Sequence, residues 1–299
     1  MRMLLLGARG FLGSHVQRAA SAAGWEVITA GRQPRGPAQR HITIDLTAAG
    51  PAGIGAVLTD VAPEAVVNCA GATSGEFPAL AAANIDVPAT LVRAMLLTRS
   101  AARLVHLGSA GEYGRGERGV PVREDSPARP VSGYGATKLG GTLAVAVARA
   151  AGLPAVVLRV FNPVGAGAPA SSLSGRAAAE IARASAQGDC VRLGNLDAVR
   201  DFVDATDMAH AALAAATTPT PHPVLNIGSG QAVSARELVH TLLKVSGLSP
   251  EIQESEPGSP RSTDVPWQQA DISAARAALG WSPRTPLSCS LTNVWRALP

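Results

Sequence analysis

The chain has 299 residues, of which 46% are hydrophobic, 16% charged and 3% aromatic, and it carries a formal net charge of +4. That balance is typical of a globular protein with one large core, or with a core and a half. Because the basic residues form no run and aromatic residues are rare, the composition excludes the clustered footprint of a nucleic-acid binder and favours small anionic ligands.

The cysteines are odd in number and lie far apart, at Cys69, Cys190 and Cys289. Without Cys-x-x-Cys spacing they predict a reduced, cytoplasmic protein with neither a disulfide scaffold nor a metal site. The apolar run at the start is too short for a signal peptide. The stretch that comes nearest to a membrane span, 143–160, is interrupted by two arginines and a proline, so we expect no membrane partner.

The first predicted element is a buried strand at 4–6, followed by a glycine-rich turn and a helix at 14–23. The turn reads Gly7-Ala8-Arg9-Gly10-Phe11-Leu12-Gly13. Glycines between a strand and a helix let the backbone approach a pyrophosphate at the helix N-terminus, where free N–H groups favour anions. The spacing is Gly-x-x-Gly-x-x-Gly, and the alternative is an ordinary tight turn.

The second predicted strand, 25–30, ends in Gly31-Arg32. NAD-binding proteins usually place an acid here for the ribose hydroxyls, whereas an arginine suits the 2′-phosphate of NADP. Arg9 in the glycine turn offers a second contact. We therefore expect NADP(H) in preference to NAD(H), the alternative being that Arg32 is a solvated loop residue.

Further strands and helices alternate along the chain. Strands are expected at 41–46, 63–69, 103–107 and 155–160, and helices at 84–99 and from Tyr134 to about 151. This alternation predicts an α/β fold, a doubly wound parallel Rossmann sheet of about seven strands.

The residue composition changes after residue 164. A Gly/Ala/Ser/Pro-rich stretch at 165–175 is expected to be mobile; then come helices at 176–187, 234–246 and 271–279, an extended run at 191–200 and a strand at 224–227. We expect an NADP-binding Rossmann domain at 1–164, completed by about 199–230. Segments 165–198 and 231–299 are expected to interleave as a smaller C-terminal α/β substrate-binding cap.

Tyr134 and Lys138 are four residues apart and share one face of the predicted helix. A lysine ammonium beside a phenol favours the phenolate and lowers the tyrosine pKa from its usual value of about 10. Such a phenol can exchange a proton where a carbonyl and an alcohol interconvert. Taken alone, the pair is also what a solvated i,i+4 contact looks like.

Several motifs in order resemble the extended short-chain dehydrogenase/reductase family, in its nucleotide-sugar branch. Beside the glycine turn and the Tyr-x-x-x-Lys pair they are Asp45-Leu46, Asn68-Cys69-Ala70-Gly71, Ser109 four before Tyr113-Gly114, Arg159–Gly165, Arg200–Val203, Asn226–Gly230, Arg261-x-x-Asp264 and Leu279-Gly280-Trp281-x-Pro283. The similarity covers nearly the whole chain.

The resemblance implies a role for each matching residue. Tyr134 would be the general acid/base, Lys138 would bind the nicotinamide ribose and lower the Tyr134 pKa, and Ser109 would hydrogen-bond the reacting oxygen. Implied cofactor contacts are Gly7, Arg9, Gly10, Phe11, Leu12, Gly13, Arg32, Asp45, Leu46, Cys69, Ala70, Gly71, Asn84, Leu107, Tyr134, Lys138 and Phe161. Implied substrate contacts are Ser109, Asn162, Arg200 and Arg261. The alternative for the two arginines is surface ion pairs with Asp201 and Asp264.

Three reactions share this site within the branch. The family's dehydratases carry an Asp and a Glu where this chain has Ala110 and Gly111, and Glu112 comes one position too late for elimination. The family's 4-epimerases usually keep an acid after the second strand, where this chain has Arg32. The resemblance therefore points to NDP-4-keto-6-deoxyhexose reductases.

Alternatives stay open at this point. The ketone could be a polyketide or antibiotic intermediate of secondary metabolism, the enzyme could be an NDP-sugar 4-epimerase, or the chain could bind NADP without catalysis. The expected partner is a small-molecule ketone. The helices at 84–99 and 140–151 are apolar enough for the homodimer that the family often forms.

Overall fold

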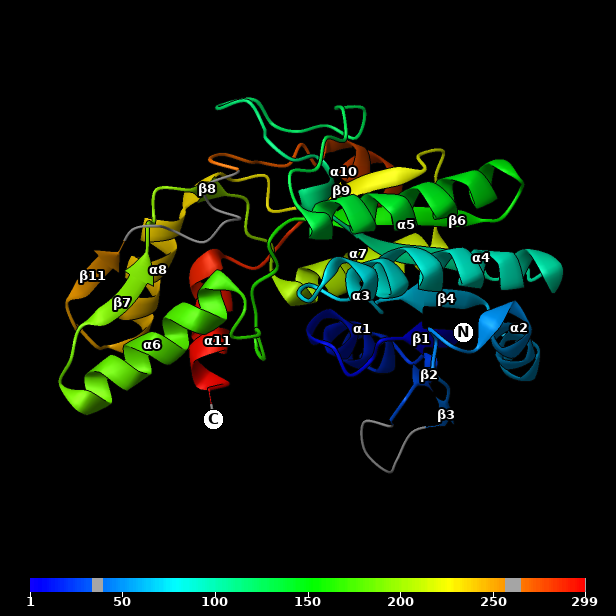
Figure 1. Ribbon diagram of the computed structural model, residues 1–299, viewed down its shortest axis with the longest axis horizontal. Coiled ribbons are helices and arrows are strands. Elements are labelled where there is room, and N and C mark those ends of the chain that lie inside the picture. The colour runs from blue at the N-terminus through cyan, green and yellow to red at the C-terminus, as the bar shows by residue number, and fades with distance from the viewer. Residues whose placement is uncertain (34–39, 256–264, 299) are drawn as a thin grey trace.

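The computed structural model describes residues 1–33, 40–255 and 265–298 (Figure 1). The predicted substrate contact Arg261 lies outside these ranges. The described chain forms a central parallel sheet with helices on both faces and a smaller lobe beside it, drawn at the left of Figure 1.

Seven parallel strands make the central sheet, in the order β3-β2-β1-β4-β5-β6-β9. They span Arg2–Leu6 (β1), Glu26–Gly31 (β2), His41–Thr43 (β3), Ala65–Asn68 (β4), Arg103–Ser109 (β5), Ala155–Val160 (β6) and Val224–Ile227 (β9). The order reverses at β1, which pairs with β2 on one side and β4 on the other. Ligands of such sheets bind where the carboxyl ends of the strands meet this reversal. The predicted doubly wound sheet of about seven strands is confirmed.

Helices cover the two faces because side chains alternate along each strand. Met3 and Leu5 of β1 face a core formed with α1 (Phe11–Ala22), α7 (Ala205–Thr217) and α10 (Ser273–Leu279). Leu4 and Leu6 face the opposite core, which is formed with α2 (Gly50–Val61), α4 (Val87–Leu97) and α5 (Gly133–Ala150). Neither α2 nor α7 is among the helices expected from the sequence.

The helix expected at 84–99 begins earlier and changes type along its length. It consists of α3 (Phe77–Ala81), the π-turn η1 (Ala82–Asp86) and α4. By length and composition this run, 77–97, is apolar enough to cross a membrane, and 44% of its apolar window is buried inside the protein. It replaces 143–160 as the stretch nearest to a membrane span.

The smaller lobe has a core of its own. Helices α6 (Leu173–Gln187), α8 (Ala235–Ser246) and α11 (Leu287–Arg296) pack with β7 (Val191–Gly194) and β11 (Ile252–Ser255). A second two-stranded sheet joins β8 (Val199–Arg200) to β10 (Val233–Ser234). The extended run expected at 191–200 is therefore two short strands in different sheets. The expected domain boundaries stay a prediction.

Candidate functional site

The glycine turn follows β1 and packs tightly against its neighbours. Gly7 has φ +77°, and a Cβ there would lie 2.5 Å from the Ala70 nitrogen. A Cβ at Gly13 would lie 2.1 Å from the Gly7 carbonyl oxygen, so neither position accepts a side chain. Gly10 is exposed and precedes the first turn of α1. The turn thus presents bare backbone at a helix N-terminus, which fits a dinucleotide pyrophosphate.

Phe11 and Leu12 of the turn are both half-buried. The Phe11 ring meets the His15 ring edge-on, with centroids 5.3 Å apart. Leu12 packs against the core under α1. Their predicted contacts with a cofactor stay predictions.

The ends of β1, β2 and β3 bring two arginines together with an acid. Arg9 donates a hydrogen bond to the Gln33 side chain, and Arg9 and Arg32 are both exposed. The pKa of the Asp45 carboxyl is lowered by hydrogen bonds from Thr47 and by the charge of Arg32. Two exposed cations at this edge could hold a 2′-phosphate.

Side-chain hydrogen bonds from Asn68 and Asn84 hold the loop after β4 in place. Asn68 Oδ1 accepts a hydrogen bond from the Ala70 nitrogen at 3.0 Å. Asn84, in the π-turn, bonds both the nitrogen (3.0 Å) and the carbonyl (2.9 Å) of Ala72 and also donates to Thr137 Oγ1 at 3.1 Å. A Cβ at Gly71 would lie 2.8 Å from Asn84 Oδ1. Asn84 therefore fixes the predicted cofactor loop, 69–71, against α5.

Ser109 ends β5 and caps the short 3-10 helix η2 (Ala110–Glu112). Its Oγ accepts a hydrogen bond from the Gly111 nitrogen at 3.1 Å, and its own nitrogen donates to Glu112 Oε1 at 2.8 Å. The first contact uses a lone pair of the hydroxyl, so the hydroxyl hydrogen stays available to donate to a substrate oxygen.

Helix α5 brings Tyr134 to Ser109 because its first turn lies directly on η2. A Cβ at Gly135 would lie 2.3 Å from the Gly111 carbonyl oxygen, so only glycine permits this approach. A Cβ at Gly111 would lie 3.4 Å from Ser109 Oγ and 3.6 Å from two ring carbons of Tyr134. The Ser109 hydroxyl and the Tyr134 ring therefore flank one point.

Lys138, one turn further along α5, is buried and donates a hydrogen bond to the Leu107 carbonyl oxygen. Burial lowers the pKa of its ammonium, and the charge of Glu112 acts in the opposite direction. Its Nζ lies 3.9 Å from where a Cβ of Gly71 would be, which places it beside the predicted cofactor loop. Burial raises the pKa of the neighbouring Cys69 thiol to about 12, so that thiol stays neutral.

Two of the predicted substrate residues, Asn162 and Arg200, lie after β6 and in β8. Asn162 has φ +23° and donates to the Asp201 carbonyl at 2.9 Å. The Asp201 carboxylate is fully buried and accepts hydrogen bonds from Ser229, Gly230 and Ala270. Burial lowers the pKa of Arg200 to about 10. The Asp201 carboxylate is thus held by the Ser229 hydroxyl and three backbone nitrogens, and Arg200 donates to the Val199 carbonyl oxygen at 2.8 Å.

Phe161 is fully buried and Leu46 is partly buried. Phe161 has no exposed surface and packs in an apolar cluster with Tyr113 and Ile272. Leu46 packs against the core of the α2 face. Their predicted contacts with a cofactor stay predictions.

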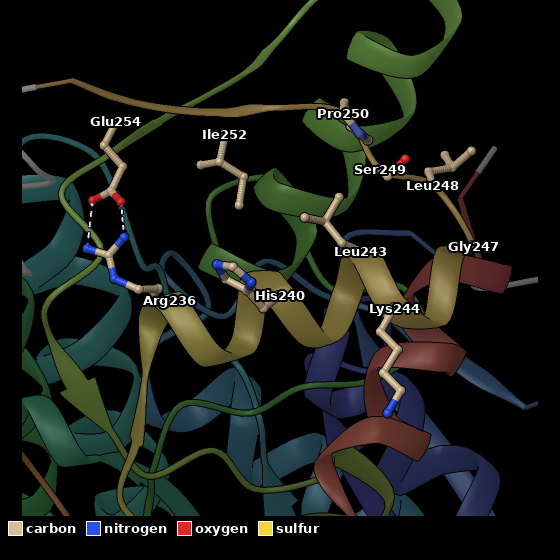
Figure 2. Close-up of a pocket in the computed structure, with 10 residues that line it drawn as sticks. All are labelled: Arg236, His240, Leu243, Lys244, Gly247, Leu248, Ser249, Pro250, Ile252 and Glu254. Carbon is tan, nitrogen blue, oxygen red and sulfur yellow. Dashed lines mark hydrogen bonds and ion pairs between the residues drawn. The ribbon is translucent and has the colours of Figure 1, made fainter.

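A groove of about 600 Å³ lies elsewhere, between α8 and the segment 247–254 that follows it (Figure 2). The residues that line it are Arg236, His240, Leu243, Lys244, Gly247, Leu248, Ser249, Pro250, Ile252 and Glu254. None of them is a predicted site residue. Within the described residues, no group of three His, Cys, Asp or Glu side chains is placed to hold a metal ion.

Comparison with known proteins agrees with this arrangement. The sequence profile of the NAD dependent epimerase/dehydratase family matches residues 3–228. The chain belongs to this family. A relative from Kitasatospora kifunensis, named dTDP-6-deoxy-L-talose 4-dehydrogenase (NAD(P)(+)), is 40% identical over 99% of this chain and 95% of its own length. The predicted family is confirmed.

Two less similar proteins also match over nearly the full length of this chain. GDP-6-deoxy-D-mannose reductase from Pseudomonas aeruginosa is 26% identical over 98% of this chain and 95% of its own length. The solved structure of MoeE5 in complex with UDP-glucose and NAD has a TM-score of 0.85 at 29% identity, over 99% of this chain and 98% of that one. This chain is therefore an enzyme of the epimerase/dehydratase type, with that fold along its whole length.

The sequence reasoning missed one residue of the site. Glu112 was expected only to point away from the elimination position, yet it accepts a hydrogen bond from the backbone of Ser109. The signal was present, because Ser109-Ala110-Gly111-Glu112 has the Ser-x-x-Glu spacing of a capping box.

Proposed function

We propose that this enzyme is an NADPH-dependent ketoreductase that acts on the C4 ketone of a nucleoside-diphosphate 4-keto-6-deoxyhexose. The observation that carries the proposal is the close approach of two hydroxyl-bearing side chains: a Cβ at Gly111 would lie 3.4 Å from Ser109 Oγ and 3.6 Å from two ring carbons of Tyr134. A ketone oxygen within reach of both hydroxyls can receive a hydrogen bond and a proton.

The chemistry divides among three residues. Bound NADPH supplies the hydride. Ser109 donates its hydroxyl hydrogen to the ketone oxygen and stabilises the negative charge that develops on it. Tyr134 gives that oxygen its proton, and the Lys138 ammonium one helical turn away favours the phenolate that is left. The Leu107 carbonyl orients Lys138 for this role.

Reduction is favoured over elimination because the loop beside Tyr134 offers no carboxylate where elimination would need one. A side chain at position 111 would meet both Ser109 and Tyr134, but the residue is glycine. Glu112, the nearby acid, is fully buried and paired with Arg159. No carboxylate is therefore supplied by this loop at the point where a proton would be removed for elimination.

The names of the relatives support the substrate class. The relative from Kitasatospora kifunensis is a 4-dehydrogenase of a dTDP-6-deoxyhexose, and the one from Pseudomonas aeruginosa is a reductase of a GDP-6-deoxyhexose. Oxidation of a C4 alcohol and reduction of the C4 ketone are one reaction in opposite directions. Arg200, and Arg261 outside the described residues, would hold the diphosphate.

The experiment is a panel of ketones mixed with enzyme and NADPH while the absorbance of NADPH is followed. Nucleotide-linked 4-keto-6-deoxyhexoses should be reduced, and polyketide or aromatic ketones should not. The reverse pattern would favour a non-sugar ketone, and Arg200→Ala would then leave KM unchanged instead of raising it.

Cofactor choice is tested separately through the exposed arginine after β2. Arg32→Ala should raise the KM for NADPH by about tenfold or more, as expected for loss of one charged contact worth about 1.5–3 kcal/mol. The KM for NADH should change little. Equal effects on both cofactors would show that Arg32 does not contact the 2′-phosphate.

We also propose a homodimer formed through α4 and α5. Leu97 on α4 and Leu143 and Val147 on α5 are large apolar side chains that are 68%, 56% and 71% exposed, and exposed apolar surface of this kind marks interaction sites. Sedimentation analysis should give twice the 30.3 kDa of one chain. A monomer at micromolar concentration would contradict this assembly.

A further inference from the structure

Glu112 is an acid with no exposed surface, in the loop that carries Ser109. Its Oε1 accepts a hydrogen bond from the Ser109 nitrogen at 2.8 Å, and its Oε2 accepts one from Arg159 Nε at 2.7 Å. The two oxygens of one carboxylate thus tie the end of β5 to β6. A buried carboxylate is retained only where such partners offset its loss of hydration.

The chain of buried polar contacts continues beyond Arg159. The guanidinium carbon of Arg159 lies 4.4 Å from the centre of the Tyr113 ring, a cation–π contact. The Tyr113 hydroxyl donates to Asn226 Oδ1 at 2.7 Å, and Asn226 belongs to β9. Ser109 is therefore connected through buried polar groups to the next two strands of the sheet.

Gly108 shows that space is reserved for this ion pair. A Cβ at position 108 would lie 2.7 Å from Glu112 Oε1 and 3.3 Å from Arg159 Cγ. Since real Cβ atoms do not approach other atoms to 2.7 Å, a larger residue would displace the carboxylate. The ion pair between Glu112 and Arg159 therefore requires glycine at position 108.

We propose that Glu112 is a positioning residue of the reductase site: its carboxylate, held in place by Arg159, fixes the end of β5, which carries both Ser109 and the Leu107 carbonyl that orients Lys138. The proposal rests on the proposed function only in the kinetic part of its test. Glu112 touches neither substrate nor cofactor and acts through Ser109 and Lys138.

The groups around Lys138 make Glu112 the relevant charge. Glu112 comes from η2, the neutral thiol Cys69 from the loop after β4, His106 from β5 and Tyr134 from the same helix. Burial of His106 lowers its pKa well below the usual value, so it is neutral and adds no charge at working pH. Burial lowers the pKa of Lys138, and the charge of Glu112 acts in the opposite direction.

The composition of the chain allows a direct measurement. Lys138 and Lys244 are its two lysines, so a Lys244→Arg background leaves a single ε-amino signal in NMR spectra of lysine-labelled protein. In this background Glu112→Gln should move the Lys138 titration to lower pH. Glu124→Gln is the matched control: Glu124 bonds the Asn226 backbone at 2.8 Å, and its substitution should leave the Lys138 titration in place.

Kinetics provide the second readout. In Glu112→Gln, kcat should fall roughly tenfold to a hundredfold because Ser109 is less well placed, while the KM for NADPH stays within twofold. The loss of activity at high pH, where Lys138 gives up its proton, should also begin at a lower pH than in the unmodified enzyme. If Glu112→Gln does not fold because Arg159 is left unpaired, Glu112→Gln with Arg159→Gln removes both charges and should show the same downward movement of the Lys138 titration.

A folded variant whose Lys138 titration is unchanged, or whose kcat stays within twofold, overturns the proposal. The NMR titration needs no substrate. Failure of the enzyme to reduce any ketone would therefore count against the proposed function and would leave the Lys138 result to decide on Glu112.

Discussion

Replacing Gly111 by alanine should lower the activity of the enzyme without lowering its stability. A Cβ there would lie 3.4 Å from Ser109 Oγ and 3.6 Å from the Tyr134 ring, which is ordinary van der Waals contact. Gly111→Ala should therefore fold, and it should gain about 0.4–1 kcal/mol because alanine restricts the unfolded chain. Thermal unfolding should show an equal or slightly higher Tm.

Activity should nevertheless fall, because the methyl group fills the space between the Ser109 hydroxyl and the side of the Tyr134 ring, next to the place that the ketone oxygen needs. That oxygen has to approach both hydroxyls to about 3 Å. Forcing a substrate past one extra methyl group in a packed site costs about 1–3 kcal/mol, which corresponds to a loss in kcat/KM of about 5- to 150-fold.

The assay compares kcat/KM for ketone reduction in Gly111→Ala, in Gly53→Ala and in the unmodified enzyme. Gly53 lies in α2, where a Cβ would meet the Ala49 methyl carbon at 3.1 Å, and its substitution should not affect turnover. A folded Gly111→Ala enzyme with kcat/KM within twofold of the unmodified enzyme would refute the placement of the reacting oxygen.

Two further predictions follow from buried groups. Gly13→Ala should abolish cofactor binding measured by fluorescence titration, because its Cβ would lie 2.1 Å from the Gly7 carbonyl oxygen; near-normal affinity would contradict the tight turn. Burial raises the pKa of Tyr113 from 10.0 to about 12, and this group favours the folded state fully below pH 10 and loses that effect as pH rises to 12. The two-unit shift amounts to about 3 kcal/mol, so urea unfolding should show this extra loss between pH 10 and 12 in the unmodified protein and not in Tyr113→Phe.

The parts of the fold that could be predicted are those in which one residue type is physically required. Glycine is needed at Gly7 and Gly13 because a Cβ would collide with backbone atoms, and the apolar runs of β1 and β6 are buried on both faces. The helix α7 was missed because its alanine-rich sequence shows little contrast between a buried and an exposed face. Its helical state follows from packing on α1 and the sheet.

The parts of the site that could not be predicted depend on contacts between distant segments. The π-turn at Asn84 lies against α5, where a Cβ at Gly141 would be 2.3 Å from the Asn84 carbonyl oxygen. Glu112 could be excluded from elimination by its position, but its pairing with Arg159 required knowing that β5 and β6 are neighbours. A helical period and a family resemblance both mark Tyr134 and Lys138, the resemblance alone marks Ser109, and the roles of all three stay predictions.

Transfer of a deuterium label from the cofactor tests the central claim most directly. The enzyme is mixed with a nucleotide-linked 4-keto-6-deoxyhexose and NADPH that carries deuterium at the transferred position, and the product is examined by mass spectrometry and NMR. We expect one deuterium at C4, one NADP⁺ for each product, and neither in Tyr134→Phe. A product that is isomerised or dehydrated, without deuterium at C4 and with the cofactor unchanged, would contradict the assignment as a ketoreductase.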